Sequence, residues 1–119
     1  MVKLKRVYDA AEKSDGRRIL VERLWPRGIK KGDRRVADWL RDIAPSPELR
    51  RWYGHEPKKW PEFKRRYRAE LRKADRHRLL EALADEARRG TVTLVYAARD
   101  TERNSAVVVR EELEKLPPP

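Results

Sequence analysis

A short apolar run, Ile19-Leu20-Val21, constrains the fold more strongly than any other stretch of the chain. A continuous apolar run of this kind is typical of a β-strand that is covered on both faces. We therefore expect a strand over residues 17–24, which Pro26 and Gly28 bring to an end. Such a strand lies inside a sheet, with other layers packed against it.

Two further strands are expected, one towards each end of the chain. Residues 91–97 form the clearest strand in the sequence, because they are β-branched and apolar. Residues 3–8 alternate imperfectly and predict a shorter strand. The passage between residues 24 and 91 has helical spacing and fits a crossover connection, which makes the strands at 17–24 and 91–97 parallel.

Helices are expected in five segments. Apolar residues recur at helical spacing over residues 36–43, 47–54, 60–72, 76–89 and 105–116. Ser46 is a candidate N-cap, either Asn104 or Ser105 caps the last helix, and Gly90 is a suitable helix end. The pattern predicts a single α/β domain over residues 1–119, in which about four to five helices cover a small, mostly parallel sheet of about three strands. The three prolines at 117–119 are expected to be frayed.

The composition excludes several kinds of site. The chain has no Cys, which rules out disulfides, thiolate nucleophiles and Cys-based metal sites, and its two His residues, His55 and His77, are too few for a metal site. No apolar run approaches the roughly 18 residues that span a bilayer, and the N-terminus lacks the apolar segment of a signal peptide. We expect a cytoplasmic protein with no metal and no membrane partner. The sequence identifies no cofactor and does not define the oligomeric state.

The net charge of the chain indicates which kinds of partner it can attract. The 119 residues include 31 Lys and Arg against 20 Asp and Glu, a formal net charge of +11. Such a charge attracts anions of every kind and says nothing about the fold. Anionic small molecules and nucleic acids are therefore the two classes of partner to weigh.

A polar cluster lies at the end of the strand at 17–24. In open α/β sheets, ligands bind outside the carboxyl ends of the strands, and Arg23 and Arg27 lie at such an end. Arginine offers a planar fork of donors to carboxylate or phosphate, and Gly28 allows a backbone N–H to approach an anion closely. The alternative is structural: Arg23 pairs with a buried carboxylate, and Trp25 packs in the core.

A second polar cluster follows the strand at 91–97. Tyr96 lies near the carboxyl end of that strand, Asp100 in the next loop, and Asn104 at the start of the last helix, where free N–H groups favour anions. An Asp beside arginines acts as a base or orients a guanidinium. Alternatively, Asp100 is a turn residue and Asn104 is a cap, each satisfying local backbone donors.

Ser46 and Arg50 form a third pair, which shares one helix face. A catalytic Ser46 needs a base, and His55 is the only nearby candidate. We therefore interpret Ser46 as a cap, whereas Arg50 is expected to reach the crevice.

Nucleic acid is the alternative partner. Residues 58–78 hold ten Lys and Arg against three acidic residues, with Trp60, Phe63 and Tyr67 among them. Phosphates pair with basic side chains and bases stack on aromatic rings. The candidate nucleic-acid contacts are Lys58, Lys59, Lys64, Arg65, Arg68 and Arg72. The aromatic residues share one helical stripe, however, which also fits a core-facing position with the basic residues in solvent, and no known nucleic-acid-binding motif is present.

Several blocks of the sequence together resemble a known family. They are residues 6–9, residues 15–31 with Arg23-Leu24-Trp25-Pro26-Arg27-Gly28 among them, Trp39, residues 43–46, Leu49-Arg50, residues 63–67, Glu70-Leu71, and residues 93–100 with Asn104. Over nearly its full length the chain resembles domain-of-unknown-function family 488, in its short YeaO-like branch. Arg99 and Ser105 stand where Lys and His are common in that family, so no titratable role is carried over to position 105. The resemblance implies a small bacterial or archaeal α/β protein, and it implies no activity.

The favoured prediction is a crevice that binds a phosphate- or carboxylate-bearing metabolite or nucleotide. Its expected lining is Arg23, Arg27, Arg50, Tyr96, Asp100 and Asn104. The sequence assigns no catalytic residue and leaves open whether the ligand is turned over. The alternatives are a nucleic-acid-binding or accessory protein that uses the face of residues 58–78, and a structural partner with no ligand of its own.

Overall fold

The computed structural model describes residues 1–118 and contains one four-stranded sheet. The strands are β1 (Val2–Arg6), β2 (Arg17–Leu20), β3 (Asp38–Trp39) and β4 (Val92–Tyr96), in the order β1-β4-β2-β3. All three neighbouring pairs are parallel. The expected parallel pairing of the second strand with the strand near residue 94 is therefore confirmed, with Ile19 beside Leu94.

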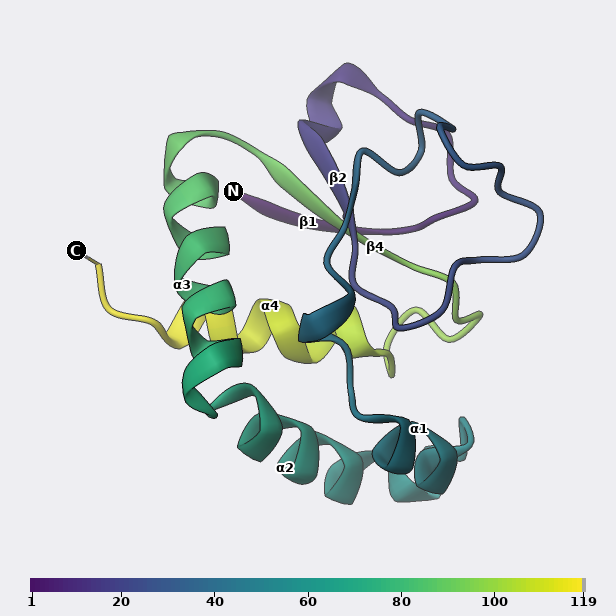
Figure 1. Ribbon diagram of the computed structural model, residues 1–119, viewed down its shortest axis with the longest axis vertical. Coiled ribbons are helices and arrows are strands. Elements are labelled where there is room, and N and C mark those ends of the chain that lie inside the picture. Colours follow the sequence, from purple (N-terminus) through teal and green to yellow (C-terminus); the bar gives the residue numbers. More distant parts are fainter. Residues whose placement is uncertain (119) are drawn as a thin grey trace.

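Four α-helices lie on one face of this sheet, to the left of it and below it in Figure 1. They are α1 (Pro47–Tyr53), α2 (Trp60–Leu71), α3 (Ala74–Arg89) and α4 (Ser105–Lys115). Short 3-10 turns occupy Lys13–Asp15, Arg41–Ile43 and Pro57–Lys59. Ile19, Leu94 and Val92 point from the sheet into the larger core, where they pack with apolar residues of all four helices. The predicted α/β class is confirmed.

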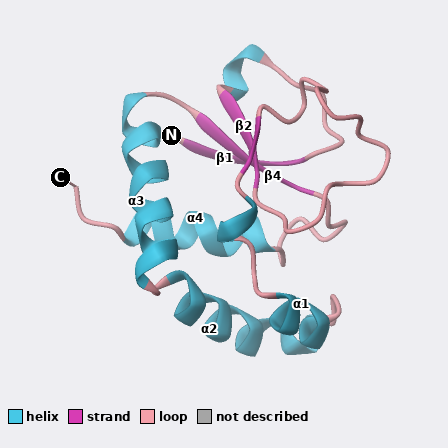
Figure 2. Cartoon of the chain, in the orientation of Figure 1, coloured by secondary structure: helices cyan, strands magenta, loops and turns pink. Residues whose placement is uncertain are grey.

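Loops cover the opposite face of the sheet, and they form most of the right-hand side of Figure 2. A smaller core lies under them, made of Val7, Leu20, Ile29, Val36 and Val95. Trp25 and Trp39 meet edge to face above it, with ring centroids 5.4 Å apart. Adjacent β2 residues Ile19 and Leu20 thus enter different cores, which explains the continuous apolar run of this strand.

The helix expected over residues 36–43 is absent, and this prediction was wrong. The segment forms β3 and the 3-10 turn at 41–43 instead. The N–H groups of Ala37 and Leu40 donate to the carbonyl oxygens of Arg18 and Leu20, which form the open edge of β2. Pairing with this edge satisfies backbone groups that a helix of two turns cannot satisfy, so tertiary context overrides a short helical pattern. The sheet consequently has four strands where about three were expected.

The caps agree with the sequence. The Ser46 hydroxyl accepts the Leu49 N–H at 3.2 Å, and the Asn104 side chain accepts the Val107 N–H at 3.1 Å. Of the frayed end expected at 117–119, Pro119 lies outside the described residues. No helix within residues 1–118 has the length and hydropathy needed to cross a membrane.

A buried ionic network joins β1 to β2 beneath the loops. Asp15 is fully buried, and its carboxylate pairs with Lys3 at 2.8 Å, with Lys5 at 2.9 Å and with Arg18 at 2.7 Å. Burial opposes the ionisation of Asp15, but hydrogen bonds from Lys3, Lys5, the Glu12 N–H and Arg18 outweigh it and hold its pKa well below the usual range. The carboxylate is therefore charged at every ordinary pH and fixes three cations on one face of the sheet.

Candidate functional site

The carboxyl ends of β2 and β4 lie side by side, and the chain leaves them in opposite directions. The segment after β2 crosses the loop-covered face, whereas the segment after β4 leads to α4 on the helical face. This is a topological switch point, where open α/β sheets bind their ligands. A pocket of about 70 Å³ lies there. Its lining consists of Glu22, Arg23, Pro45, Arg50, Tyr53, His55, Phe63, Ala98, Arg103, Asn104 and Ser105.

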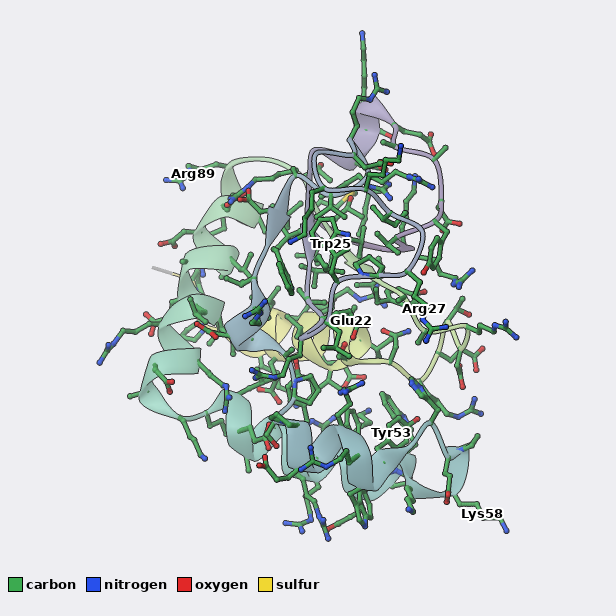
Figure 3. The ribbon with its side chains drawn as sticks, turned by 45° about the vertical axis from the view of Figure 1, so that its right-hand side comes forward. Glu22, Trp25, Arg27, Tyr53, Lys58 and Arg89 are labelled. Atoms are coloured by element: carbon green, nitrogen blue, oxygen red, sulfur yellow. The ribbon has the colours of Figure 1, made fainter. Side chains whose placement is uncertain are left out.

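Glu22, the second residue after β2, is a largely buried acid in this pocket. Figure 3 shows it between the sheet above and Tyr53 of α1 below. One of its carboxyl oxygens accepts the Ala97 N–H at 3.3 Å. Burial raises the pKa of Glu22, and the Ala97 hydrogen bond and the charge of Arg50 offset this only in part. Glu22 therefore binds a proton more readily than an exposed glutamate does.

Three arginines reach the pocket from different parts of the chain. Arg23 follows β2 and donates through Nε to the Pro45 carbonyl at 3.2 Å. Arg50 comes from α1, and Arg103 comes from the loop before α4. Arg103 pairs with Asp100 at 2.9 Å, whereas neither Arg23 nor Arg50 forms an ion pair with a carboxylate of residues 1–118. Their guanidinium donors are thus available to an oxyanion.

The start of α4 closes one side of the pocket. The Asn104 amide donates to the Asp100 carbonyl at 2.9 Å while its oxygen caps the helix. The Ser105 hydroxyl lies 3.4 Å from the Val21 carbonyl oxygen and donates to it. Both side chains are buried and are already used by the protein. Asn104 and Ser105 therefore shape the pocket. Among the described residues, no base lies at hydrogen-bond distance from the Ser105 hydroxyl oxygen.

The structure brings three of the six expected lining residues together, namely Arg23, Arg50 and Asn104. Tyr96 is buried in the helical core. Asp100 accepts the N–H groups of Glu102 and Arg103, so it forms a local turn beside the pocket.

Arg27 lies on the loop after β2, to the right of Glu22 in Figure 3, and is exposed. Its carbonyl accepts the Tyr8 hydroxyl at 2.9 Å, and it does not line the pocket. Gly28, beside it, has a φ of 78° and open space around it. The stretch at 23–28 thus divides: Arg23 belongs to the pocket, and the remainder belongs to the loop layer.

The pocket also contains residues that sequence reasoning missed, above all Glu22 and Arg103. One signal for Glu22 was present, since an acid directly after a buried apolar run has little access to solvent. No comparable signal marks Arg103, whose place depends on how the loop between β4 and α4 folds. The described residues contain no group of three His, Cys, Asp or Glu able to hold a metal ion.

The basic helical face proposed for nucleic acid is largely paired within the protein. Lys64 and Arg68 of α2 bind Glu111 of α4 at 3.1 and 2.8 Å. Arg65 pairs with Glu62 on its own helix. Arg72 lies 3.7 Å from Glu112, Lys59 donates to the Trp52 carbonyl, and Lys58 is exposed. Phe63 and Tyr67 are buried in the core, so they cannot stack on bases.

Comparison with known proteins gives a consistent family. Residues 1–116 match the family model described as "Inactive DUF488-N3 subclade". The uncharacterised protein YeaO of Escherichia coli is 45% identical over 115 residues, which is 97% of this chain and 98% of that protein. The uncharacterised protein Rv3073c of Mycobacterium tuberculosis is 43% identical over 112 residues, covering 94% and 92% of the two chains. No solved structure matches this chain. The chain therefore belongs to the DUF488 family, as a YeaO-like member.

Proposed function

We propose that this protein binds a small anion, a phosphate- or carboxylate-bearing metabolite or nucleotide, in the pocket between β2 and β4. One observation carries the proposal. Guanidinium groups from three separate segments, Arg23, Arg50 and Arg103, line one pocket, and the first two have no carboxylate partner among residues 1–118. Arg23 and Arg103 are partly buried, so their guanidinium groups lose some hydration, and a bound oxyanion supplies hydrogen-bond acceptors in its place.

The size of the pocket supports an oxyanion group as the part that is enclosed. About 70 Å³ accommodates a few water molecules, or one phosphate or carboxylate group. The remainder of a larger ligand would extend from the pocket past Arg50 and His55, which are exposed. A second element of recognition is the start of α4, because the N-terminal end of a helix favours negative charge.

Binding without turnover is the form of this function that we favour. The subclade whose family model matches the chain is described as inactive. The two serines near the pocket are also engaged: Ser105 donates to Val21, and Ser46 donates to Glu70 at 2.6 Å while capping α1. A cytoplasmic location, in contact with phosphorylated metabolites, remains part of the proposal.

Replacement of one arginine tests the proposal. Arg50→Gln removes a guanidinium that makes no ion pair with residues 1–118, so the fold should persist. A charge-assisted hydrogen bond contributes roughly 1.5–3 kcal/mol. We expect the affinity for inorganic phosphate, measured by isothermal titration calorimetry, to fall by about tenfold or more.

Arg51→Gln is the matched control, because Arg51 is the next residue of α1, is exposed and does not line the pocket. Equal phosphate affinities for both variants and the unchanged protein would show that the binding is a diffuse effect of net charge. No heat and no chemical-shift change with phosphate in any of the three proteins would refute the site.

Nucleic-acid binding through residues 58–78 is the second candidate. The net charge of +11 favours it, and the ion pairs of Lys64, Arg65 and Arg68 weaken it. It predicts DNA or RNA affinity that falls steeply with salt. If the protein binds neither DNA nor RNA at low salt, this second candidate function is excluded.

A further inference from the structure

The lining of the proposed anion pocket includes an acid, Glu22. Glu22 shares the lining with three arginines, and its carboxylate would repel any fully deprotonated anion placed beside it. The only hydrogen bond that its carboxyl group makes to residues 1–118 is the one accepted from the Ala97 N–H at 3.3 Å. The other carboxyl oxygen is therefore free to bond a ligand.

We infer that Glu22 selects the ligand: the pocket takes an oxyanion that brings its own acidic proton, or another O–H or N–H donor, to face the Glu22 carboxylate. The arginines bind the charged oxygens of such a ligand, and Glu22 accepts the proton on its remaining oxygen. Monohydrogen phosphate has this chemistry and sulfate lacks it. The inference rests on the proposed anion-binding function and specifies its ligand class.

The groups around Glu22 explain why a proton between Glu22 and the ligand determines whether an anion binds. The charged and titratable groups that face it come from each element around the pocket: Arg23 after β2, Arg50 and Tyr53 on α1, His55 after α1, Arg103 before α4, and Tyr67 on α2. The charge of Arg50 favours ionised Glu22, whereas burial disfavours it. Ionised Glu22 accepts a donor from the ligand, and an anion without a proton binds only after Glu22 itself takes one up.

Proton uptake has a thermodynamic signature that needs no mutation. A ligand whose binding takes up one proton loses about tenfold in affinity for each pH unit of increase, once Glu22 is ionised in the free protein. A ligand that carries the proton shows no such loss. We expect the affinity for inorganic phosphate to be nearly constant between about pH 7.5 and pH 8.5, and the affinity for sulfate to fall roughly tenfold over that interval.

The variant Glu22→Gln removes the discrimination. The amide that replaces the carboxyl group still accepts the Ala97 N–H through its carbonyl oxygen, and its NH₂ group donates to a deprotonated oxygen of the anion. We expect phosphate to bind the unchanged protein at least tenfold more tightly than sulfate near pH 8, and the ratio to approach one in the variant. Glu81 is an exposed acid of α3 outside this pocket, so Glu81→Gln is the control for the loss of one negative charge.

Calorimetric titrations of the full chain with sodium phosphate and sodium sulfate at two pH values separate the outcomes. Three results together support the inference: the unchanged protein binds phosphate tightly, it binds sulfate weakly and with an affinity that falls with increasing pH, and Glu22→Gln binds the two anions with equal affinity. Equal affinities with the same pH dependence in the unchanged protein overturn the inference and leave the anion pocket in place. Failure of both anions to bind the unchanged protein, the Glu22→Gln variant and the Glu81→Gln control overturns the proposed function, and the inference with it.

Discussion

The buried carboxylate of Asp15 gives the sharpest prediction about stability. Asp15 is 0% exposed and Arg18 is 2% exposed, so replacement of Asp15 by Asn leaves a guanidinium in the interior without its counter-charge. Breaking a buried ion pair from one side costs about 3–5 kcal/mol. The lower end applies here, because Arg18 also donates to the carbonyl oxygens of Val7, Asp9, Ala10 and Arg35.

A loss of about 3 kcal/mol lowers the melting temperature of a chain of this length by about 12 °C. Calorimetric or circular-dichroism melting of Asp15→Asn measures it. Glu12→Gln is the matched control: Glu12 pairs with the same Lys5, but it is exposed, so the melting temperature should hardly change. Equal melting temperatures for Asp15→Asn and Glu12→Gln would refute the reasoning.

The same network predicts a pH dependence with a definite sign. The folded-state pKa of Asp15 lies below its unfolded value, so its contribution to stability is present above the unfolded pKa of about 3.9 and is lost as the pH falls towards the folded value. The difference in unfolding free energy between the unchanged protein and Asp15→Asn should be constant from about pH 7 to pH 5 and should narrow below about pH 4.

Three further variants test the fold and the pocket. Gly16→Ala should lower the free energy of unfolding by on the order of 4 kcal/mol. The new alanine Cβ would lie 1.9 Å from the Thr91 carbonyl oxygen, at the start of the β2–β4 pairing. Gly32→Ala has a similar positive φ and open space, so chemical denaturation should show a loss of only about 1 kcal/mol. Glu22→Gln should melt above the unchanged protein at neutral pH in buffer without phosphate or sulfate, since the pKa of Glu22 is raised by burial. A raised folded-state pKa stabilises only at low pH, so the two melting temperatures should converge near pH 4; a constant difference would contradict the assignment.

Two of the strands that the sequence predicted, β2 and β4, have side chains that enter both cores. β4 is buried at every position, and the adjacent β2 residues Ile19 and Leu20 enter the helical core and the loop-side core, so each strand shows an apolar run in the sequence. β3 has no such pattern. Asp38 is exposed and Trp39 is partly exposed, and the segment is a strand because its N–H groups meet the open edge of β2. Edge pairing of this kind depends on backbone groups, which are the same in every residue.

The loop layer explains why only half of the expected lining residues meet. The sequence correctly predicted that β2 and β4 are parallel, so that their carboxyl ends lie side by side, because a long helical connection joins them. It did not reveal which side chains turn inward there. Arg27 lies four residues beyond Arg23 in the chain, yet the loop carries it away from the pocket towards Tyr8.

The same loop accounts for the position of Glu22. Strand β2 ends at Leu20, and the Trp39 indole N–H donates to the Glu22 carbonyl oxygen at 2.6 Å, which fixes the backbone where β2 becomes loop. With its backbone held there, the Glu22 side chain lies beside Ala97, at the end of β4. Burial of a carboxyl group with a single hydrogen-bond donor is unfavourable for folding, and buried acids of this kind are frequent at functional sites. Within residues 1–118 the Glu22 carboxyl group forms no ion pair and accepts one hydrogen bond, from the Ala97 N–H, and our proposal assigns the missing donor to the ligand.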